Sequence, residues 1–320
     1  MVERPFPETS GSVGQRFSDR LWGAILTGLG GAVLVVAGII VWTLLDVSAP
    51  LARHEHLLAF LTGTVWDPER GVFGALTYIY GTVVSSTVAL LIAAPVSIGL
   101  ALFLTEMAPP ALRPIVSFPL ELLAGIPSVV YGLWGVFVLV PLMRDNVGPV
   151  LEKYLGWTGL FVEPNFGVGM FTASVILAIM IFPVISSISR DVMRVVPVSQ
   201  REAALALGAT RWEMIRLSVL RNARIGIVGS VILGLGRALG ETMAVTMVIG
   251  NHPDIVKNLF APAYTLASVI ANEFTEATGD LYLSALIEIG LALFLVTIVV
   301  NAIARLLVWA VTRGNSARPA

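Results

Sequence analysis

The sequence predicts an all-α integral membrane protein with six transmembrane helices, and two observations support this prediction. The 320 residues are 56% hydrophobic and only 13% charged, whereas soluble proteins carry about 25% charged residues. In addition, several apolar runs reach the length of about 20 residues that a helix needs to cross a bilayer. There are six, at residues 21–45, 75–104, 115–142, 167–189, 225–250 and 281–311.

The first run follows a polar stretch, residues 1–20. It is longer than the apolar core of a signal peptide, and no clear cleavage pattern of small residues follows it. We therefore expect a retained helix. The third run contains Pro119, Gly125 and Pro127, which predict a broken helix of the kind that lines the pathway in transporters.

A seventh apolar candidate, residues 255–274, lies between the fifth and sixth runs. Lys257, Asn258 and Pro262 interrupt it. As a span, it would also place the C-terminal arginines on the wrong side of the membrane. We expect an external interfacial or re-entrant segment there.

Basic residues predict the orientation, because Lys and Arg are retained on the cytoplasmic side. If the N-terminus lies inside, 14 basic residues fall in cytoplasmic segments and 5 in external ones, with Arg237 inside a span. We therefore predict that both termini are cytoplasmic. Residues 1–20 and 312–320 would be the two tails, and residues 21–311 a single transmembrane domain.

Composition also limits the chemistry of the chain. There is no cysteine, which excludes disulfides, thiolate metal sites and cysteine nucleophiles. His54 and His56 are two residues apart without further metal ligands, so we expect no metal site. No Gly-x4-Gly-Lys-Ser/Thr motif occurs, so no nucleotide cofactor is expected in this chain. The formal net charge of -1 gives no sign of a nucleic-acid partner.

The most informative segment is the loop between the fourth and fifth runs, residues 190–224. Two stretches in it, Ser199 to Glu202 and Thr210 to Glu213, fit the capping box that begins a helix. Gly208 lies between them, where a left-handed residue can end the first helix. The loop is therefore predicted to hold a short helix, a tight turn and a second helix. The first helix has a small apolar surface suited to a partner's groove, although a basic loop lying on anionic lipid is an alternative.

The residues of the first helix suggest a family. Glu202, Ala203 and Ala204, followed after three residues by Gly208, resemble the EAA loop of bacterial ABC-importer permeases. In that family the loop is the coupling helix that docks into the nucleotide-binding subunit. The resemblance therefore implies an ABC-importer permease of type I-like architecture.

The family pattern continues beyond the glycine with an aliphatic residue and then Leu-Pro. Here those places carry Ser218, Leu220 and Arg221. The aliphatic position is thus polar and the proline is absent. This departure concerns the geometry at the end of the second helix and not the docking role.

Further stretches narrow the family. They resemble the C-type permeases of the bacterial phosphate-specific (Pst) ABC transport system and cover roughly residues 75–250, namely Gly81 to Glu106, Gly125 to Gly132 and Gly234 to Val245. The resemblance implies a multi-pass protein of the bacterial inner membrane. It also implies a second, related permease, two ATPase subunits that use ATP and Mg²⁺, and an external phosphate-binding protein. The chain itself would be no enzyme and would hold no cofactor.

Two charges lie inside the fifth predicted span. An Arg or Asp at a helix centre costs about 2.5–3.5 kcal/mol to insert into the membrane. We therefore expect Arg237 and Glu241 to have a structural or functional role. Four residues apart, they would share a helix face and could form a mutual ion pair. Alternatively, Arg237 presents a donor fork to a phosphate oxygen while Glu241 orients it or tunes its charge. In the resembling permeases this pair is regarded as part of the transport path.

Small residues flank this pair and predict close helix packing. They recur every four residues in two rows, Gly226, Ser230 and Gly234, and Gly236, Gly240 and Ala244. Glu121, in the broken third run, is a further candidate for the pathway, with a structural hydrogen bond as the alternative.

The sequence thus predicts the permease subunit of an ATP-driven phosphate importer, embedded in membrane lipid. A permease for another oxyanion, molybdate or sulfate, is the nearer alternative. A membrane-embedded enzyme that uses Glu241, Glu121 or Glu288 as a base is more distant, because no nucleophile or metal set accompanies them.

The orientation can be tested in this cysteine-free chain. Cysteines introduced at Ser199 and at Ser316 should both resist an impermeant thiol reagent added outside intact cells, because both positions are predicted to be cytoplasmic. Labelling at either position would contradict the six-span orientation. A cysteine at Arg70, in a predicted external segment, provides the positive control.

Overall fold

The computed structural model describes residues 13–54 and 56–313, and within them it is almost entirely helical. Six helical segments are long and apolar enough to cross a membrane, as predicted. They are Leu21–Leu51, Leu76–Met107, Ser128–Thr158, Met170–Arg194, Arg211–Leu239 and Asp280–Leu306. Residues 255–274 contain no such segment, as expected.

The first half of the described chain contains α1 to α7 with three π-helical segments and a 3-10 turn, labelled η. In order, these are α1 Val13–His54, α2 Leu57–Thr62, α3 Leu76–Leu102, η1 Phe103–Met107, α4 Leu112–Gly125, α5 Ser128–Trp134, η2 Gly135–Leu139, α6 Val140–Leu142, η3 Met143–Val147, α7 Gly148–Leu155 and η4 Gly156–Thr158. The second half follows as α8 Met170–Arg194, α9 Val198–Ala206, α10 Arg211–Met214, η5 Ile215–Leu220, α11 Arg221–Leu239, α12 Met243–Thr246, α13 Leu266–Glu273 and α14 Asp280–Arg313.

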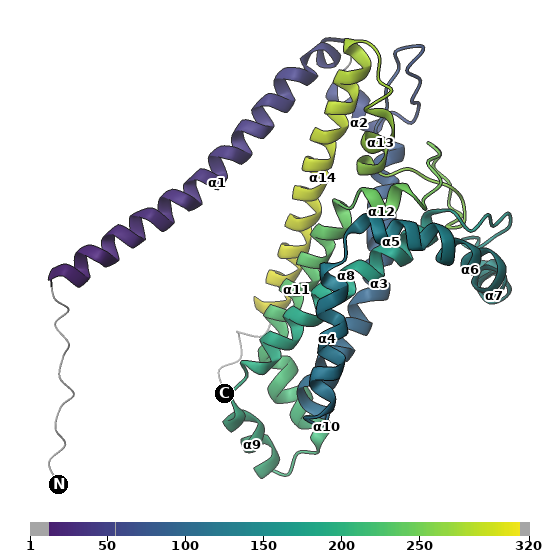
Figure 1. Cartoon of the computed structure of the whole chain (residues 1–320). Helices are drawn as coiled ribbons and strands as arrows, with labels where there is room; N and C mark the ends of the chain where they lie inside the picture. Colours follow the sequence, from purple (N-terminus) through teal and green to yellow (C-terminus); the bar gives the residue numbers. More distant parts are fainter. Residues whose placement is uncertain (1–12, 55, 314–320) are drawn as a thin grey trace, which may run out of the picture.

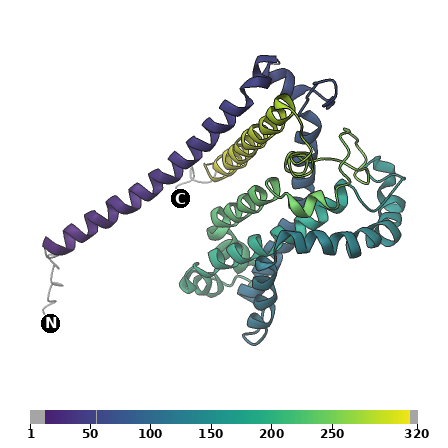
Figure 2. The same cartoon turned by 45° about the horizontal axis from the view of Figure 1, so that its top comes forward.

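Helix α8 is the centre of the bundle. It packs against α3 on one side and α11 on another, and it is the most buried of the six spans. Its apolar residues, such as Ile176, Ile181 and Ile185, are fully buried in the largest core cluster. Helix α1 instead contacts α14 and then projects away from the bundle (Figure 1, Figure 2). Its side chains, such as Leu34, are mostly exposed.

The row Gly226, Ser230 and Gly234 packs against α8, as predicted. A Cβ atom on Gly226 would lie 2.3 Å from Cγ1 of Val192, and one on Gly234 would lie 2.7 Å from Ile185. Between them the hydroxyls of Ser189 and Ser230 form a buried hydrogen bond of 2.8 Å. Because Gly226 and Gly234 have no side chains, α8 and α11 can approach each other closely.

The third predicted span is broken, as predicted, but its long apolar segment begins 13 residues later than residue 115. Pro119 lies inside α4, whereas the chain breaks at Ile126 and Pro127. Ile126 adopts an extended conformation, with ψ 130°, because a residue that precedes proline is driven out of the helical region. The long apolar segment therefore starts at Ser128 instead of residue 115.

The fifth span is also shifted. Its helix begins at Arg211 and ends at Leu239, whereas the prediction was residues 225–250. The apolar residues beyond the end are buried inside the protein, with Ala244, Val245 and Val248 at most 1% exposed. Their hydrophobicity thus reflects burial in the protein core, which resembles a membrane span in sequence.

Irregular backbone fills the region after α12 and satisfies the first turn of α8. Backbone amides of Gly169, Met170 and Phe171 donate to carbonyls of Val248, Ala261 and Leu259 at 2.8–3.1 Å. A helix leaves its first N–H groups without internal partners, and non-helical backbone within a membrane protein must be buried and satisfied. Carbonyls of this irregular segment thus supply the partners that the start of α8 needs.

The packing against α8 predicts a contrast between two glycines of α11. Gly226→Ala should lower thermal stability by about 1–3 kcal/mol, because overpacking strains a well-packed contact and Val192 is stiff. Gly229→Ala is the matched control, since a Cβ there has nothing within 4 Å, and it should change stability by less than about 1 kcal/mol. The measurement is thermal unfolding of the purified chain in detergent. Equal effects of the two changes would contradict the packing argument.

Candidate functional site

Helix α9 and the turn after it form the first candidate site. Gly208 has φ +86° and open space around its Cβ position, so it is the left-handed residue predicted to end the first helix. Its amide donates to the carbonyl of Leu205 at 3.0 Å, and the amide of Ala209 donates to Ala204 at 3.2 Å. These bonds satisfy carbonyls at the end of α9.

Of the two predicted capping boxes, only the second exists. The amide of Thr210 donates to Oε2 of Glu213 at 2.8 Å, and the amide of Glu213 donates to Oγ1 of Thr210 at 3.3 Å. The box at Ser199 is wrong, because α9 already begins at Val198 and its cap is Pro197. The fixed φ of Pro197 sets the cap two residues earlier than predicted, and Ser199 lies within the first turn.

The outer surface of this segment is exposed and partly apolar. Glu202 and Ala203 are exposed, and Leu207, at the tip, is 89% exposed. Trp212, on α10, is 59% exposed. An exposed apolar helix face of this kind is suited to a groove on a partner protein.

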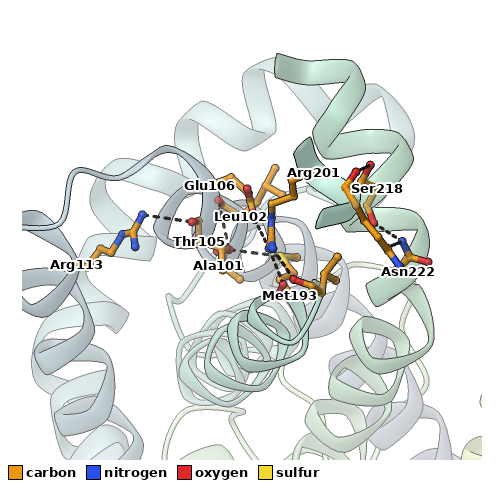
Figure 3. A network of polar contacts seen from close by, with 11 residues as sticks. Ala101, Leu102, Thr105, Glu106, Arg113, Met193, Arg201, Ser218 and Asn222 are labelled. Atoms are coloured by element: carbon orange, nitrogen blue, oxygen red, sulfur yellow. Dashed lines mark hydrogen bonds and ion pairs between the residues drawn. The ribbon is translucent and has the colours of Figure 1, made fainter. Parts of the chain in front are cut away.

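Arg201 fixes α9 to the bundle (Figure 3). Its guanidinium forms an ion pair with Glu106 in η1, with Nη2 2.8 Å from Oε1. It also donates to the backbone carbonyls of Met193, at 3.0 Å, and Val196. The side chains of Arg201 and Glu106 are only 16% and 7% exposed. One side chain thus joins α9 to the ends of both α3 and α8.

A second link explains the departure from the family pattern at Ser218. This residue is buried in η5, and its hydroxyl donates to the carbonyl of Gln200 in α9 at 3.1 Å. Asn222 donates to the side-chain oxygen of Gln200 at 2.6 Å and also to the carbonyl of Ser218. The polar residue at the aliphatic position therefore ties α9 to the start of the fifth span.

The second candidate site lies at the other end of that span. Arg237 is in the last turn of α11, where the helix dipole favours a positive charge. Its side chain is exposed, and its charge acts on the hydroxyl of Tyr131 in α5. Within residues 13–54 and 56–313 it has no ion pair within 4.0 Å.

The predicted geometry of Arg237 and Glu241 is therefore wrong. Helix α11 ends at Leu239, and Glu241 lies in the short connection to α12, so the two do not share a helix face. Oε1 of Glu241 instead accepts a hydrogen bond of 3.4 Å from the amide of Ala244. The mutual ion pair, one of the two interpretations, is absent from the described part of the chain.

Glu121 lies elsewhere. Its side chain is 69% exposed, and Oε1 is 4.0 Å from Nη2 of Arg190 in α8. The second row of small residues is also divided, since Gly240 ends α11 while Ala244 belongs to α12. In α12, Ala244 packs against Gly132 of α5. A Cβ atom on Gly132 would lie 3.2 Å from the Cα atom of Ala244.

The contacts of Glu106 with Arg201 and of Arg190 with Glu121 were not predicted from the sequence. Glu106 occurred in a matched stretch and Arg190 in the basic count, but neither was a candidate. The available signal was an acidic residue at the end of an apolar run and an arginine close to the end of another. No cluster of three or more His, Asp or Glu side chains is placed to hold a metal ion in the parts of the chain described.

Comparisons with known proteins show the family of the chain. Residues 93–313 match the family described as binding-protein-dependent transport system inner membrane component. A phosphate transport system permease protein PstC from Mesorhizobium japonicum is 52% identical over 251 residues, which is 77% of each chain. PstC from Haemophilus influenzae is 50% identical over 254 residues, 78% of this chain and 80% of that one. PstC 2 from Mycobacterium tuberculosis is 40% identical over 299 residues, 91% of each.

Solved structures support the fold. A methionine ABC transporter in inward-facing conformations matches 75% of this chain and 98% of its own, with TM-score 0.54 and 17% identity. A bacterial ABC transporter that imports alginate matches 89% and 98%, with TM-score 0.51 and 20% identity. With six apolar helices and a match over residues 93–313, the chain belongs to the family of inner membrane components of binding-protein-dependent transport systems.

Proposed function

We propose that this chain is a permease subunit of an ATP-driven importer and forms part of the transmembrane pathway for inorganic phosphate. Relatives named as phosphate permeases, at 40–52% identity, support this substrate. The observation that carries the proposal is Arg237, a guanidinium without an ion-pair partner in the described chain, at the end of a membrane helix. Because no carboxylate of the described residues neutralises this charge, the guanidinium is available to an anion.

Arg237 offers an anion what water would otherwise supply. Its planar fork can donate two parallel hydrogen bonds to a phosphate oxygen pair, and its charge offsets the dehydration of the anion. Glu241, beyond the helix end, would limit the net positive charge of this region. Molybdate and sulfate could use the same fork, so the names of the relatives favour phosphate over these oxyanions.

The loop with Glu202, Ala203, Ala204 and Gly208 would couple phosphate transport to ATP hydrolysis by the ATPase subunits. Its exposed apolar tip would dock into an ATPase subunit at the cytoplasmic face. A closing motion of the ATPases would pull on α9, and the Arg201 contacts would pass that displacement to α3 and α8. The bundle would thus change between outward-facing and inward-facing states.

The proposed assembly contains this chain, a second and related permease, two ATPase subunits and an external phosphate-binding protein. ATP and Mg²⁺ would bind to the ATPase subunits only. The exposed apolar side chains of α1, such as Leu34 and Trp42, would face lipid or the second permease.

The role of Arg237 can be separated from a role in assembly. Arg237→Leu should leave co-purification of the ATPase intact, because the side chain has no ion pair to lose, and should reduce phosphate uptake at least about tenfold, as expected for lost charge-assisted hydrogen bonds. Arg237→Lys keeps the charge without the fork, and it should retain partial uptake. The measurements are uptake of radiolabelled phosphate in a strain that lacks its own system and ATPase co-purification. Normal uptake by Arg237→Leu would refute the assignment.

The coupling role of Arg201 is tested by a change that removes its charge and keeps a polar side chain. Arg201→Gln leaves the carboxylate of Glu106 buried without its partner, which costs about 3–5 kcal/mol when one member of a buried pair is removed. We expect faster hydrogen exchange in α9 and fewer phosphate ions transported per ATP in proteoliposomes.

The matched control for this test is Arg305→Gln. Arg305 is exposed on α14, so the control removes the same charge without touching α9. The two variants should therefore differ in both readouts. If they transport equal amounts of phosphate per ATP, Arg201 does not transmit the motion.

A further inference from the structure

Three arginines surround a pocket that the proposed function does not use. It has a volume of about 450 Å³ and lies between α4 and α8, at the end of the bundle nearest α9. Its lining consists of Arg113, Pro114, Ser117, Phe118, Glu121, Arg190 and Arg194. Three positive charges thus share the pocket with one carboxylate, and a second carboxylate, that of Asp191, lies beside Arg190. Like charges gathered around a cavity repel one another, and a bound anion would relieve that repulsion.

Arg190 is held in place for such an anion. Its side chain is 12% exposed, and Nη1 donates to the hydroxyl of Ser117 at 2.6 Å. That hydroxyl retains a hydrogen of its own to donate into the pocket. The buried Nε of Arg190 makes no hydrogen bond within the described chain. Two carboxylates form long ion pairs with this guanidinium, Asp191 at 3.7 Å and Glu121 at 4.0 Å, beyond hydrogen-bond distance.

The other two arginines complete the lining. Arg113 donates its Nε to the backbone carbonyl of Ala108 and its Nη2 to that of Thr105 (Figure 3). These bonds fix the guanidinium and leave Nη1 available. Arg194 is exposed, and it has no ion pair or hydrogen bond from its side chain in the part of the chain described. The guanidinium groups of Arg113 and Arg190 are thus held by hydrogen bonds, whereas that of Arg194 is not. Together they can donate hydrogen bonds to several oxygens of a tetrahedral anion.

We infer that this pocket binds a phosphate-type oxyanion, either free phosphate or the phosphate group of an anionic lipid. The apolar side chains beside it, Ile115 at 66% exposure and Phe118 at 63%, place the rim at a surface suited to lipid. Its opening at the α9 end also makes it accessible to a dissolved ion. The chemistry required of the protein is the same in both cases.

The test uses the full chain, purified in a nonionic detergent, in two arms. The first measures retained phosphatidylglycerol by native mass spectrometry. The second measures radiolabelled inorganic phosphate by equilibrium dialysis after delipidation, in an Arg237→Leu background that removes the other proposed phosphate contact. The arm that gives binding identifies the source of the anion.

In the arm that gives binding, Arg194→Gln should weaken it about tenfold or more, the effect of one charge-assisted hydrogen bond. Arg305→Gln removes the same charge outside the pocket and should bind as the unchanged chain does. Since the Arg194 side chain makes no ion pair or hydrogen bond within the described residues, its loss should leave the fold intact, which circular dichroism can check. Absence of binding in both arms, or equal binding by the two variants, would overturn the inference.

This inference does not depend on the proposed function. Binding at the pocket is measured without transport, on a chain whose Arg237 is replaced. A chain that binds the anion here but moves no phosphate would contradict only the proposed function, and the reverse result would contradict only this inference.

Discussion

Close packing of α3 and α11 against α8 is the constraint on which the rest of the structure depends. The bundle has no hydrophobic driving force between helices inside lipid, so contact depends on small residues and on buried hydrogen bonds. Gly226 and Gly234 bring α11 onto α8, and the bond between Ser189 and Ser230 lies between them. Both candidate sites stand at the ends of α11, so this contact positions α10 with η5 at one end and Arg237 at the other.

Buried polar contacts make the α9 end a single unit. The Arg201 guanidinium satisfies two backbone carbonyls at the end of α8 and one carboxylate in η1, at the end of α3. A buried ion pair contributes little net stability in general, but it fixes geometry, because a displaced partner would be left buried without compensation. Ser218 adds a second contact from η5. A pull on α9 would therefore be passed to the helices instead of being absorbed in a loose loop.

The charged residues at the two candidate sites and at the arginine-lined pocket fall into three groups with different surroundings. Arg201 and Glu106 are buried and paired, so their role is structural. Arg237 is exposed at a helix end and has no ion pair in the described chain, which suits contact with a passing anion. Arg113, Arg190 and Arg194 share a pocket with one carboxylate, which suits a resident anion. The surroundings of each group, more than its residue type, determine what it can do.

The sequence by itself determined six membrane helices, the left-handed turn at Gly208 and the cap at Thr210, because apolar length and local hydrogen bonding act over few residues. The family followed from the same local patterns. Tertiary structure decided where the third and fifth spans begin and end, because burial in protein and burial in lipid select the same apolar residues. It also decided that Arg237 and Glu241 do not pair and that Arg201 meets Glu106, which is 95 residues away. Such partners depend on how helices pack, and periodicity along one segment carries no information about them.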